Sequence, residues 1–168
     1  LAELHRLPDD GNRYELVHGK LFVTPAPSWE HQELADVLAE RLWPYVAAQR
    51  LGRLQFPRSV VRFGRHTEVE PDIMVRPTLL HRPRSWAEAP RPTLIVEVLS
   101  DTTRRRDRIE KRALYLEAMI PEYWIVDGDE RLIQVVRPGE GDVDVSASLV
   151  WQPTGTTARF TLDVPDYF

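Results

Sequence analysis

The chain has 168 residues and no cysteine, so we expect one domain, and disulfides and cysteine-ligated zinc sites are excluded. Its formal net charge of −4 argues against a protein that binds nucleic acid over its whole surface, although a local basic site stays open. No apolar run approaches the roughly 20 residues of a membrane-spanning helix, and no signal peptide is visible. We therefore expect a cytoplasmic protein without a membrane partner.

The first third of the chain predicts two short strands and one long helix. Residues 13–17 and 20–24 have strand composition and are close enough to form a tight hairpin. From Trp29 onward apolar residues recur at helical spacing, and Ser28 is a suitable N-cap. Pro44 either kinks this helix or ends it.

Two strands are predicted next, and each contains a proline. Residues 54–63 read as a strand interrupted at Pro57, and residues 68–75 read as the returning strand. Pro71 inside the second strand indicates an edge position or a bulge, because proline cannot donate a hydrogen bond to the sheet.

The second half begins with a long proline-rich loop at residues 76–91, whose length favours a binding role or mobility. A buried strand follows at 93–99, then a helix at 104–119. Residues 122–127 and 131–137 predict another hairpin, and short strands fill the tail. This order of elements predicts an α/β or α+β domain with a mixed sheet.

Two carboxylates stand in apolar strand segments of the same kind. Asp72 lies in a Val-Glu-Pro-Asp-Ile run, and Glu97 lies in the middle of Leu-Ile-Val-Glu-Val-Leu. A charge buried there is costly unless it is paired or binds a metal. If the two strands are neighbours, both carboxylates converge at one end of the sheet and form a hard-cation site. Each has an ordinary alternative: Asp72 begins a turn, and Glu97 faces solvent or is half of a buried ion pair.

Several short segments occur in an order that resembles one nuclease group. They span most of the chain, at residues 14–21, 69–73, 96–100, 107–115 and 121–127. The set is similar to the PD-(D/E)XK nuclease superfamily and resembles most closely its Uma-type restriction endonuclease family. The resemblance implies a restriction-endonuclease-like αβββαβ core, a mixed sheet flanked by helices with extra β-hairpins. It also implies a divalent metal, Mg²⁺ or Mn²⁺.

The chain departs from the superfamily pattern at Leu99, where lysine is expected. The resemblance suggests that Lys111 on the following helix replaces that lysine. The helix, however, has two partly apolar faces, and its sequence does not decide which one meets the sheet. The face with Lys111 holds Asp107, Leu114, Tyr115 and Ala118, and the competing face holds Ile109, Ala113, Leu116 and Ile120. The alternative for Lys111 is a surface lysine paired with Asp107, an interaction of about 0.3–0.5 kcal/mol.

Further candidates complete the expected site. The resemblance implies that Glu15 helps to hold the metal or its water, although a solvent-facing strand position is equally compatible with the sequence. The backbone carbonyl of Val98 is a candidate third metal ligand beside Asp72 and Glu97. His31 opens the first long helix and is a weaker candidate, because a histidine there is commonly a local hydrogen-bonding residue.

Basic residues suggest where a nucleic acid would bind. Arg104, Arg105 and Arg106 begin the densest basic cluster directly after the Glu97 strand, and they suit phosphate binding at a helix start. Their alternative is a solvated face balanced by nearby glutamates. In the long loop, side chains suited to backbone contact or base stacking are His81, Arg82, Arg84 and Trp86.

Together these residues predict a metal-dependent nuclease that hydrolyses DNA by in-line attack of water and leaves a 5′-phosphate, as the superfamily implies. Two other classes stay open: a catalytically silent nucleic-acid or protein-binding module of the same fold, and a metal-dependent hydrolase of smaller phosphoesters. The tail aromatics suit either the core or a homodimer contact: Trp151, Phe160, Tyr167 and Phe168.

Overall fold

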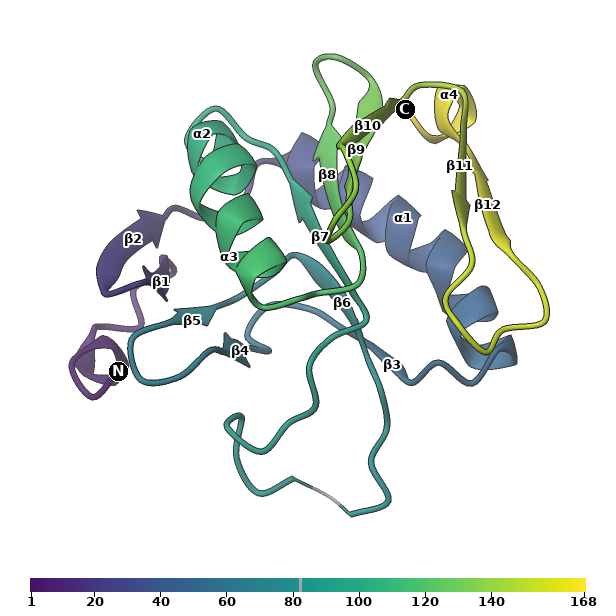
Figure 1. Ribbon diagram of the computed structural model, residues 1–168. Coiled ribbons are helices and arrows are strands. Elements are labelled where there is room, and N and C mark those ends of the chain that lie inside the picture. Colours follow the sequence, from purple (N-terminus) through teal and green to yellow (C-terminus); the bar gives the residue numbers. More distant parts are fainter. Residues whose placement is uncertain (82) are drawn as a thin grey trace.

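The computed structural model describes residues 1–81 and 83–168, and its centre is a six-stranded mixed sheet (Figure 1). The strands lie in the order β10-β9-β8-β7-β6-β3. β7 and β8 are parallel, and the other neighbouring pairs are antiparallel. The bounds are Arg53–Gln55 for β3, Ile73–Arg76 for β6, Leu94–Val98 for β7, Tyr123–Asp127 for β8, Leu132–Val136 for β9 and Val143–Val145 for β10.

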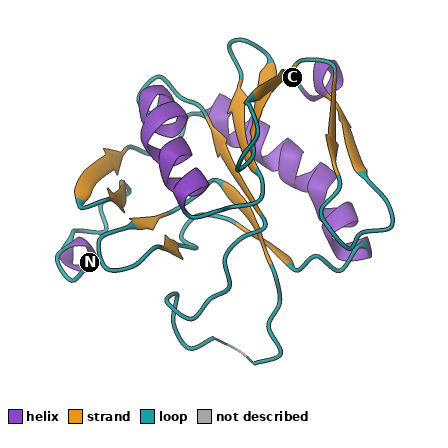
Figure 2. Cartoon of the chain, in the orientation of Figure 1, coloured by secondary structure: helices purple, strands orange, loops and turns teal. Residues whose placement is uncertain are grey.

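One face of this sheet is covered by α1 (Trp29–Ala48) (Figure 2). The helix begins as predicted, because the Ser28 hydroxyl accepts a hydrogen bond from the His31 backbone N–H at 3.2 Å. Pro44 lies inside the helix, so the alternative that it ends the helix is wrong. The first turn of α1 thereby places His31 near the end of the central strands.

The opposite face is covered by residues 104–117, here called the second helix. It consists of α2 (Arg104–Arg106), a π-helical turn (Asp107–Lys111) and α3 (Arg112–Glu117). This segment connects β7 to β8, because parallel neighbours need a crossover between them. Residues of β7 alternate between the two faces: Val96 packs in the cluster that contains α1, and Ile95 packs in the cluster of the second helix.

A second, four-stranded sheet has the order β2-β1-β5-β4. The strands β1 (Arg13–Val17) and β2 (Lys20–Thr24) lie where the sequence predicts them, after a short 3₁₀ turn at Leu4–Arg6. The remaining strands are β4 (Val61–Arg62) and β5 (Glu68–Val69).

The two proline-containing strands are each divided between the sheets, which corrects the prediction of continuous strands. Residues 54–63 supply part of β3 to the six-stranded sheet and β4 to the four-stranded sheet; residues 68–75 likewise supply β5 and most of β6. Pro57 and Pro71 lie at the crossings, where the missing N–H ends a hydrogen-bonded ladder. The crossing at Pro71 sets Asp72 between the two sheets.

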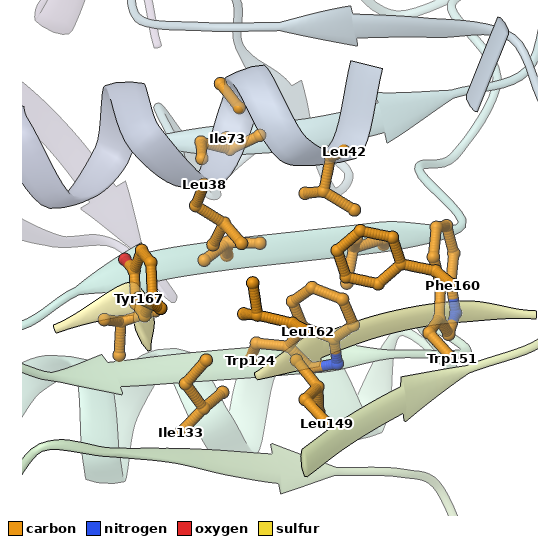
Figure 3. Packing of buried hydrophobic residues seen from close by; sticks show 14 of the residues in the cluster. Leu38, Leu42, Ile73, Trp124, Ile133, Leu149, Trp151, Phe160, Leu162 and Tyr167 are labelled. Carbon is orange, nitrogen blue, oxygen red and sulfur yellow. The ribbon is translucent and has the colours of Figure 1, made fainter. Parts of the chain in front are cut away.

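The C-terminal segment packs on the α1 side of the molecule (Figure 3). It forms the hairpin of β11 (Ser148–Trp151) and β12 (Phe160–Asp163) and the short helix α4 (Val164–Tyr167). Phe160 stacks on Trp124 with ring centroids 6.1 Å apart, and Trp151 meets Trp124 edge-on at 5.7 Å. Core packing is thus observed for three of the tail aromatics, Trp151, Phe160 and Tyr167, and Phe168 is partly buried against the core; a homodimer contact stays a prediction.

The predicted fold class is confirmed. The αβββαβ core corresponds in chain order to α1, β3, β6, β7, the second helix and β8. Within the described residues, no helix is both long and apolar enough to cross a membrane.

Candidate active site

Asp72, which directly precedes β6, lies opposite Glu97 of the neighbouring strand β7. The antiparallel register pairs Ile73 with Val96, so continuing it by one residue sets Asp72 against Glu97. Both side chains are buried, and the backbone N–H of Val98 donates a hydrogen bond to Asp72 Oδ2 at 2.9 Å. The structure thus brings together the two carboxylates that the sequence singled out.

Asp72 is held by three donors from three elements. Arg13 of β1 donates to Oδ1 at 2.8 Å, while His31 of α1 contacts Oδ2 at 3.1 Å beside the Val98 N–H. Burial raises the pKa of this carboxyl, but the His31 hydrogen bond and the Arg13 charge outweigh burial and hold it well below its usual range. Asp72 is therefore ionised at neutral pH.

Glu97 has the opposite electrostatic character. Its Oε1 accepts hydrogen bonds from Lys111 Nζ at 2.7 Å and from the Tyr115 hydroxyl at 2.9 Å. Burial raises the pKa of Glu97 to about 8; Lys111 opposes the rise, and the neighbouring charges of Asp72 and Asp107 add to it. Without a further cation, Glu97 holds a proton near neutral pH.

Glu15 is also in this cluster and is fully buried. Its Oε1 lies 2.8 Å from Lys111 Nζ and accepts the Glu70 backbone N–H at 2.9 Å, while Oε2 lies 3.3 Å from Arg106 Nη1. Burial raises the pKa of Glu15, but the charges of Lys111 and Arg106 lower it below its usual value. The solvent-facing alternative for Glu15 is wrong, since its side chain points into the protein.

Lys111 joins the two glutamates, and its side chain has no exposed area. Burial lowers the pKa of its ammonium, but the charges of Glu15 and Glu97 raise it above its usual value. The alternative of a surface lysine is wrong, because Lys111 and Asp107 are both buried; the two side chains do pair, at an Nζ–Oδ1 distance of 3.8 Å. Of the two helix faces that the sequence left open, the one with Lys111 meets the sheet.

The π-helical turn brings a further residue to this face. In an uninterrupted α-helix, at about 100° per residue, Arg106 and Lys111 would point roughly 140° apart. The extra residue in the π turn reduces that angle, and both side chains are buried. Arg106 thereby reaches Glu15 and donates to the Thr24 hydroxyl at 2.6 Å.

Two pockets meet at Asp72. One, of about 320 Å³, is lined on one side by the end of β7 and the loop after it, and contains Glu97 and Val98. The other, of about 360 Å³, runs towards Phe56 and Arg58. The residues common to both include Arg13, His31 and Asp72 as well as the segment 25–27. The two pockets together are here called the cleft.

Comparisons with known proteins agree with this geometry. The family model described as "Uma2: Putative restriction endonuclease" matches residues 1–165. The chain belongs to the Uma2 family. Among solved structures, a protein from Anabaena variabilis ATCC 29413, titled a "putative nuclease belonging to DUF820", is similar with a TM-score of 0.81 and 23% sequence identity, over 99% of this chain and 96% of that one. A comparison with curated proteins found no match. The predicted family is confirmed, and the family supports a nuclease-like function.

The Uma2 resemblance implies a divalent metal, and the donor set fits one. Within residues 1–81 and 83–168, no group of three or more histidine and carboxylate side chains is arranged to hold an ion. The two carboxylates of Asp72 and Glu97 nevertheless share one pocket with the Val98 backbone. Both hydrogen bonds of Glu97 fall on Oε1, and its pKa is raised first by burial and then by the nearby carboxylates of Asp72 and Asp107, a charge that a cation would offset. Oxygen donors of this kind suit Mg²⁺ or Mn²⁺.

The three arginines expected to bind nucleic acid occupy different environments in this Uma2 chain. Arg104 is paired with Asp127 at 2.5 Å and also with Asp129. Arg105 has a largely exposed side chain, 77%, and lies 3.3 Å from Glu110. Arg106 is buried in the carboxylate cluster. Contact with nucleic acid stays a prediction for these residues, and Arg105 has the most accessible side chain of the three.

The long loop carries the other side chains expected to touch nucleic acid. His81 and Arg84 are exposed, whereas Arg82 lies outside the described residues. Trp86 is 38% exposed, and its ring lies 5.7 Å from the guanidinium of Arg76. Its role in base stacking stays a prediction.

Sequence reasoning overlooked Arg13 and gave His31 too little weight. Arg13 begins β1 and lies on the same side of the strand as Glu15, two residues away, which is the one local signal for it. His31 contacts Asp72 through Nε2, and its Nδ1 is buried with no hydrogen-bond partner in the described part of the chain. The first turn of α1 and the start of β1 approach Asp72 only through the tertiary fold.

Proposed function

We propose that this chain is a divalent-metal-dependent endonuclease that hydrolyses phosphodiester bonds in DNA. The observation that carries the proposal is that Asp72 lies opposite Glu97 on the neighbouring β6 and β7 side of the sheet, where the two pockets of the cleft meet. Membership of the Uma2 family supports the same class of reaction.

In this proposal some residues of the site bind the cation, and others balance the charge of those ligands. Asp72, Glu97 and the Val98 carbonyl would hold Mg²⁺ or Mn²⁺, which supplies Lewis acidity to a phosphate and lowers the pKa of a water. Lys111 fixes the Glu97 carboxylate through the 2.7 Å contact to Oε1. Glu15 balances the charge of Lys111 from the other side.

Hydrolysis would form a bond between the water oxygen and phosphorus and break the bond from phosphorus to the 3′ oxygen. The products are then a 5′-phosphate and a 3′-hydroxyl. Asp72 and Glu97 are placed to orient the reacting groups, because Glu97 lies within β7 and Asp72 directly precedes β6, which is paired with β7. The cleft supplies the space for a phosphodiester beside them.

Calorimetric titration of Mn²⁺ and Mg²⁺ into the wild type, Asp72→Asn and Glu97→Gln tests the proposal. We expect binding by the wild type and at least a tenfold loss of affinity in each variant, because each removes one charged oxygen ligand. Cleavage of plasmid and short duplex DNA should fall in parallel.

Asp166→Asn is the matched control, since Asp166 is an exposed carboxylate on α4 paired with Arg41 and lies away from the cleft. It should keep both metal binding and cleavage. A folded wild type that binds neither ion, with or without DNA, would contradict the proposal and favour the silent binding module. Turnover of small phosphodiesters that ignores DNA length would favour the smaller-substrate hydrolase.

A further inference from the structure

Lys111 has no accessible path to a substrate. Its side chain has no exposed area, and its ammonium lies between the carboxylates of Glu15 and Glu97. It is not among the residues that line either pocket of the cleft. A phosphate in the cleft therefore needs a different cation to offset its charge.

Arg13 is the basic residue at the junction of the two pockets. Its Nη1 makes both of its hydrogen bonds, to the Glu70 carbonyl at 2.9 Å and to Asp72 Oδ1 at 2.8 Å. Its Nη2 makes none with the described residues and is not among the buried unpartnered atoms. The guanidinium is thus anchored through Nη1, while Nη2 is not sealed in the interior and the residue lines both pockets of the cleft.

We propose that Arg13 binds the scissile phosphate directly, through Nη2, and that Lys111 is a positioning residue that acts through Glu97 and Glu15. This assignment rests on the proposed nuclease function. Asp72 then has two tasks, since it holds the cation and orients the arginine that meets the same phosphate. A guanidinium suits the second task, because it is planar, permanently charged and able to donate from two nitrogens.

The other arginines of the cleft are less suited to this role. Arg58 lies at the outer end of one pocket, has a side chain 65% exposed and pairs with Asp9. Arg106 is buried against Glu15 and donates to Thr24. Arg13 alone among these three lines both pockets.

The salt dependence of DNA binding separates a phosphate contact from a purely structural role. Binding of a fluorescent 20-base-pair duplex is measured at several salt concentrations, in EDTA and again with Mn²⁺ at a pH too low for turnover. For Arg13→Gln we expect the slope of log K against log salt to fall by about 0.9, the value for one lost phosphate contact on duplex DNA. Arg13→Lys keeps the charge and should keep the slope. Lys111→Met should also leave it unchanged.

Cleavage kinetics provide the second readout. Arg13→Gln should lower kcat by about 100-fold, as for other donors that stabilise transition-state charge, and Arg13→Lys should lie between it and the wild type. Arg41→Gln is the matched control, because Arg41 lies on α1 away from the cleft and pairs with an exposed Asp166. It should change neither quantity.

Arg13→Gln leaves the Asp72 carboxylate without one of its hydrogen-bond partners and could therefore fail to fold. In that case the double variant Arg13→Gln/Asp72→Asn is compared with Asp72→Asn alone. An unchanged salt slope and an unchanged kcat in Arg13→Gln, with a wild type that binds and cuts DNA, overturn the role of Arg13 and leave the proposed function standing. A wild type that binds no DNA overturns both. If Lys111→Met lowers the salt slope and Arg13→Gln does not, the phosphate contact is made by Lys111 and the proposal is overturned.

Discussion

Glu97 and Asp72 are adjacent carboxylates whose protonation differs because their partners differ. The Asp72 carboxylate accepts hydrogen bonds from Arg13, His31 and the Val98 backbone N–H, so it stays ionised. Glu97 is buried, shares Lys111 with Glu15 and has the carboxylates of Glu15, Asp72 and Asp107 nearby, so its pKa is raised and it holds a proton more tightly than a free glutamate. A cation that binds near both would have to displace that proton.

The raised pKa of Glu97 predicts how stability depends on pH in the absence of metal. The folded protein holds the proton up to about pH 8, whereas the unfolded chain releases it near pH 4.5. The stability contributed by that proton is complete below pH 4.5 and is lost as the pH rises through about 8, by at most about 1.4 kcal/mol per pH unit. Glu97→Gln mimics the protonated side chain and lacks this loss.

Urea unfolding in EDTA at pH 6 and pH 8 measures this effect. Relative to the wild type, Glu97→Gln should become more stable as the pH rises. Glu140→Gln, a change at an exposed carboxylate, serves as the control and should show no such trend. A constant difference between wild type and Glu97→Gln at the two pH values would mean that Glu97 is ionised throughout.

Lys111 is predicted to matter for stability as well as for the site. Lys111→Met leaves Glu15 and Glu97 buried without their shared cation, and breaking a buried ion pair in this way typically costs about 3–5 kcal/mol. Lys20→Met, at an exposed lysine 3.7 Å from Glu110, should cost less than about 1 kcal/mol.

Denaturant unfolding at pH 7 compares these variants. In the double variant Lys111→Met/Glu97→Gln the cost should be smaller than the sum of the two single changes, because each single change already breaks the contact between these two side chains. Strict additivity would show that the two side chains do not interact energetically despite their 2.7 Å contact.

At the scale of elements, the π-helical turn explains how one short helix supplies several buried charges. An α-helical repeat would direct Arg106 away from the sheet, whereas the extra residue in Asp107–Lys111 keeps it against Glu15. The sequence did not reveal this turn, since its apolar pattern is compatible with an ordinary helix. Both helix faces are partly apolar, so the burial of Lys111 was decided by partners on β1 and β7 and not by helical periodicity.

Pro44 is a second element-scale irregularity, because proline inside a helix removes one backbone hydrogen bond and crowds the preceding turn. Its side chain is exposed, so it contributes little packing of its own. Pro44→Ala should therefore stabilise the protein by about 1–3 kcal/mol and leave Mn²⁺ affinity unchanged.

Thermal and urea unfolding of Pro44→Ala test this expectation, with Ala47→Gly, at an exposed position of the same helix, as a control that should destabilise by about 1 kcal/mol. Loss of stability in Pro44→Ala would show that the proline shapes α1 so that Leu42 and Val46 reach the core.

At the scale of the whole molecule, the sequence predicted the mixed sheet, the first hairpin and the convergence of the two central carboxylates. These features have local signals: alternating or continuous apolar runs, capping residues and acids in apolar strands. The passage of two strand segments from one sheet to the other had only Pro57 and Pro71 as signals. Arg13 and His31 could not be assigned with similar certainty, because neither is distinguished locally and each meets Asp72 through long-range packing. A homodimer stays a prediction.

The site residues are far apart in the sequence, and this determines when the site can form during synthesis of the chain. The contact of Arg13 with Asp72 spans 59 residues, and that of Thr24 with Arg106 spans 82. The segment with Glu15 emerges from the ribosome long before Lys111 has been synthesised. A nascent chain that lacks Lys111 cannot assemble the carboxylate cluster. Only a polypeptide that extends past Lys111, with the second helix docked on the sheet, holds these groups together.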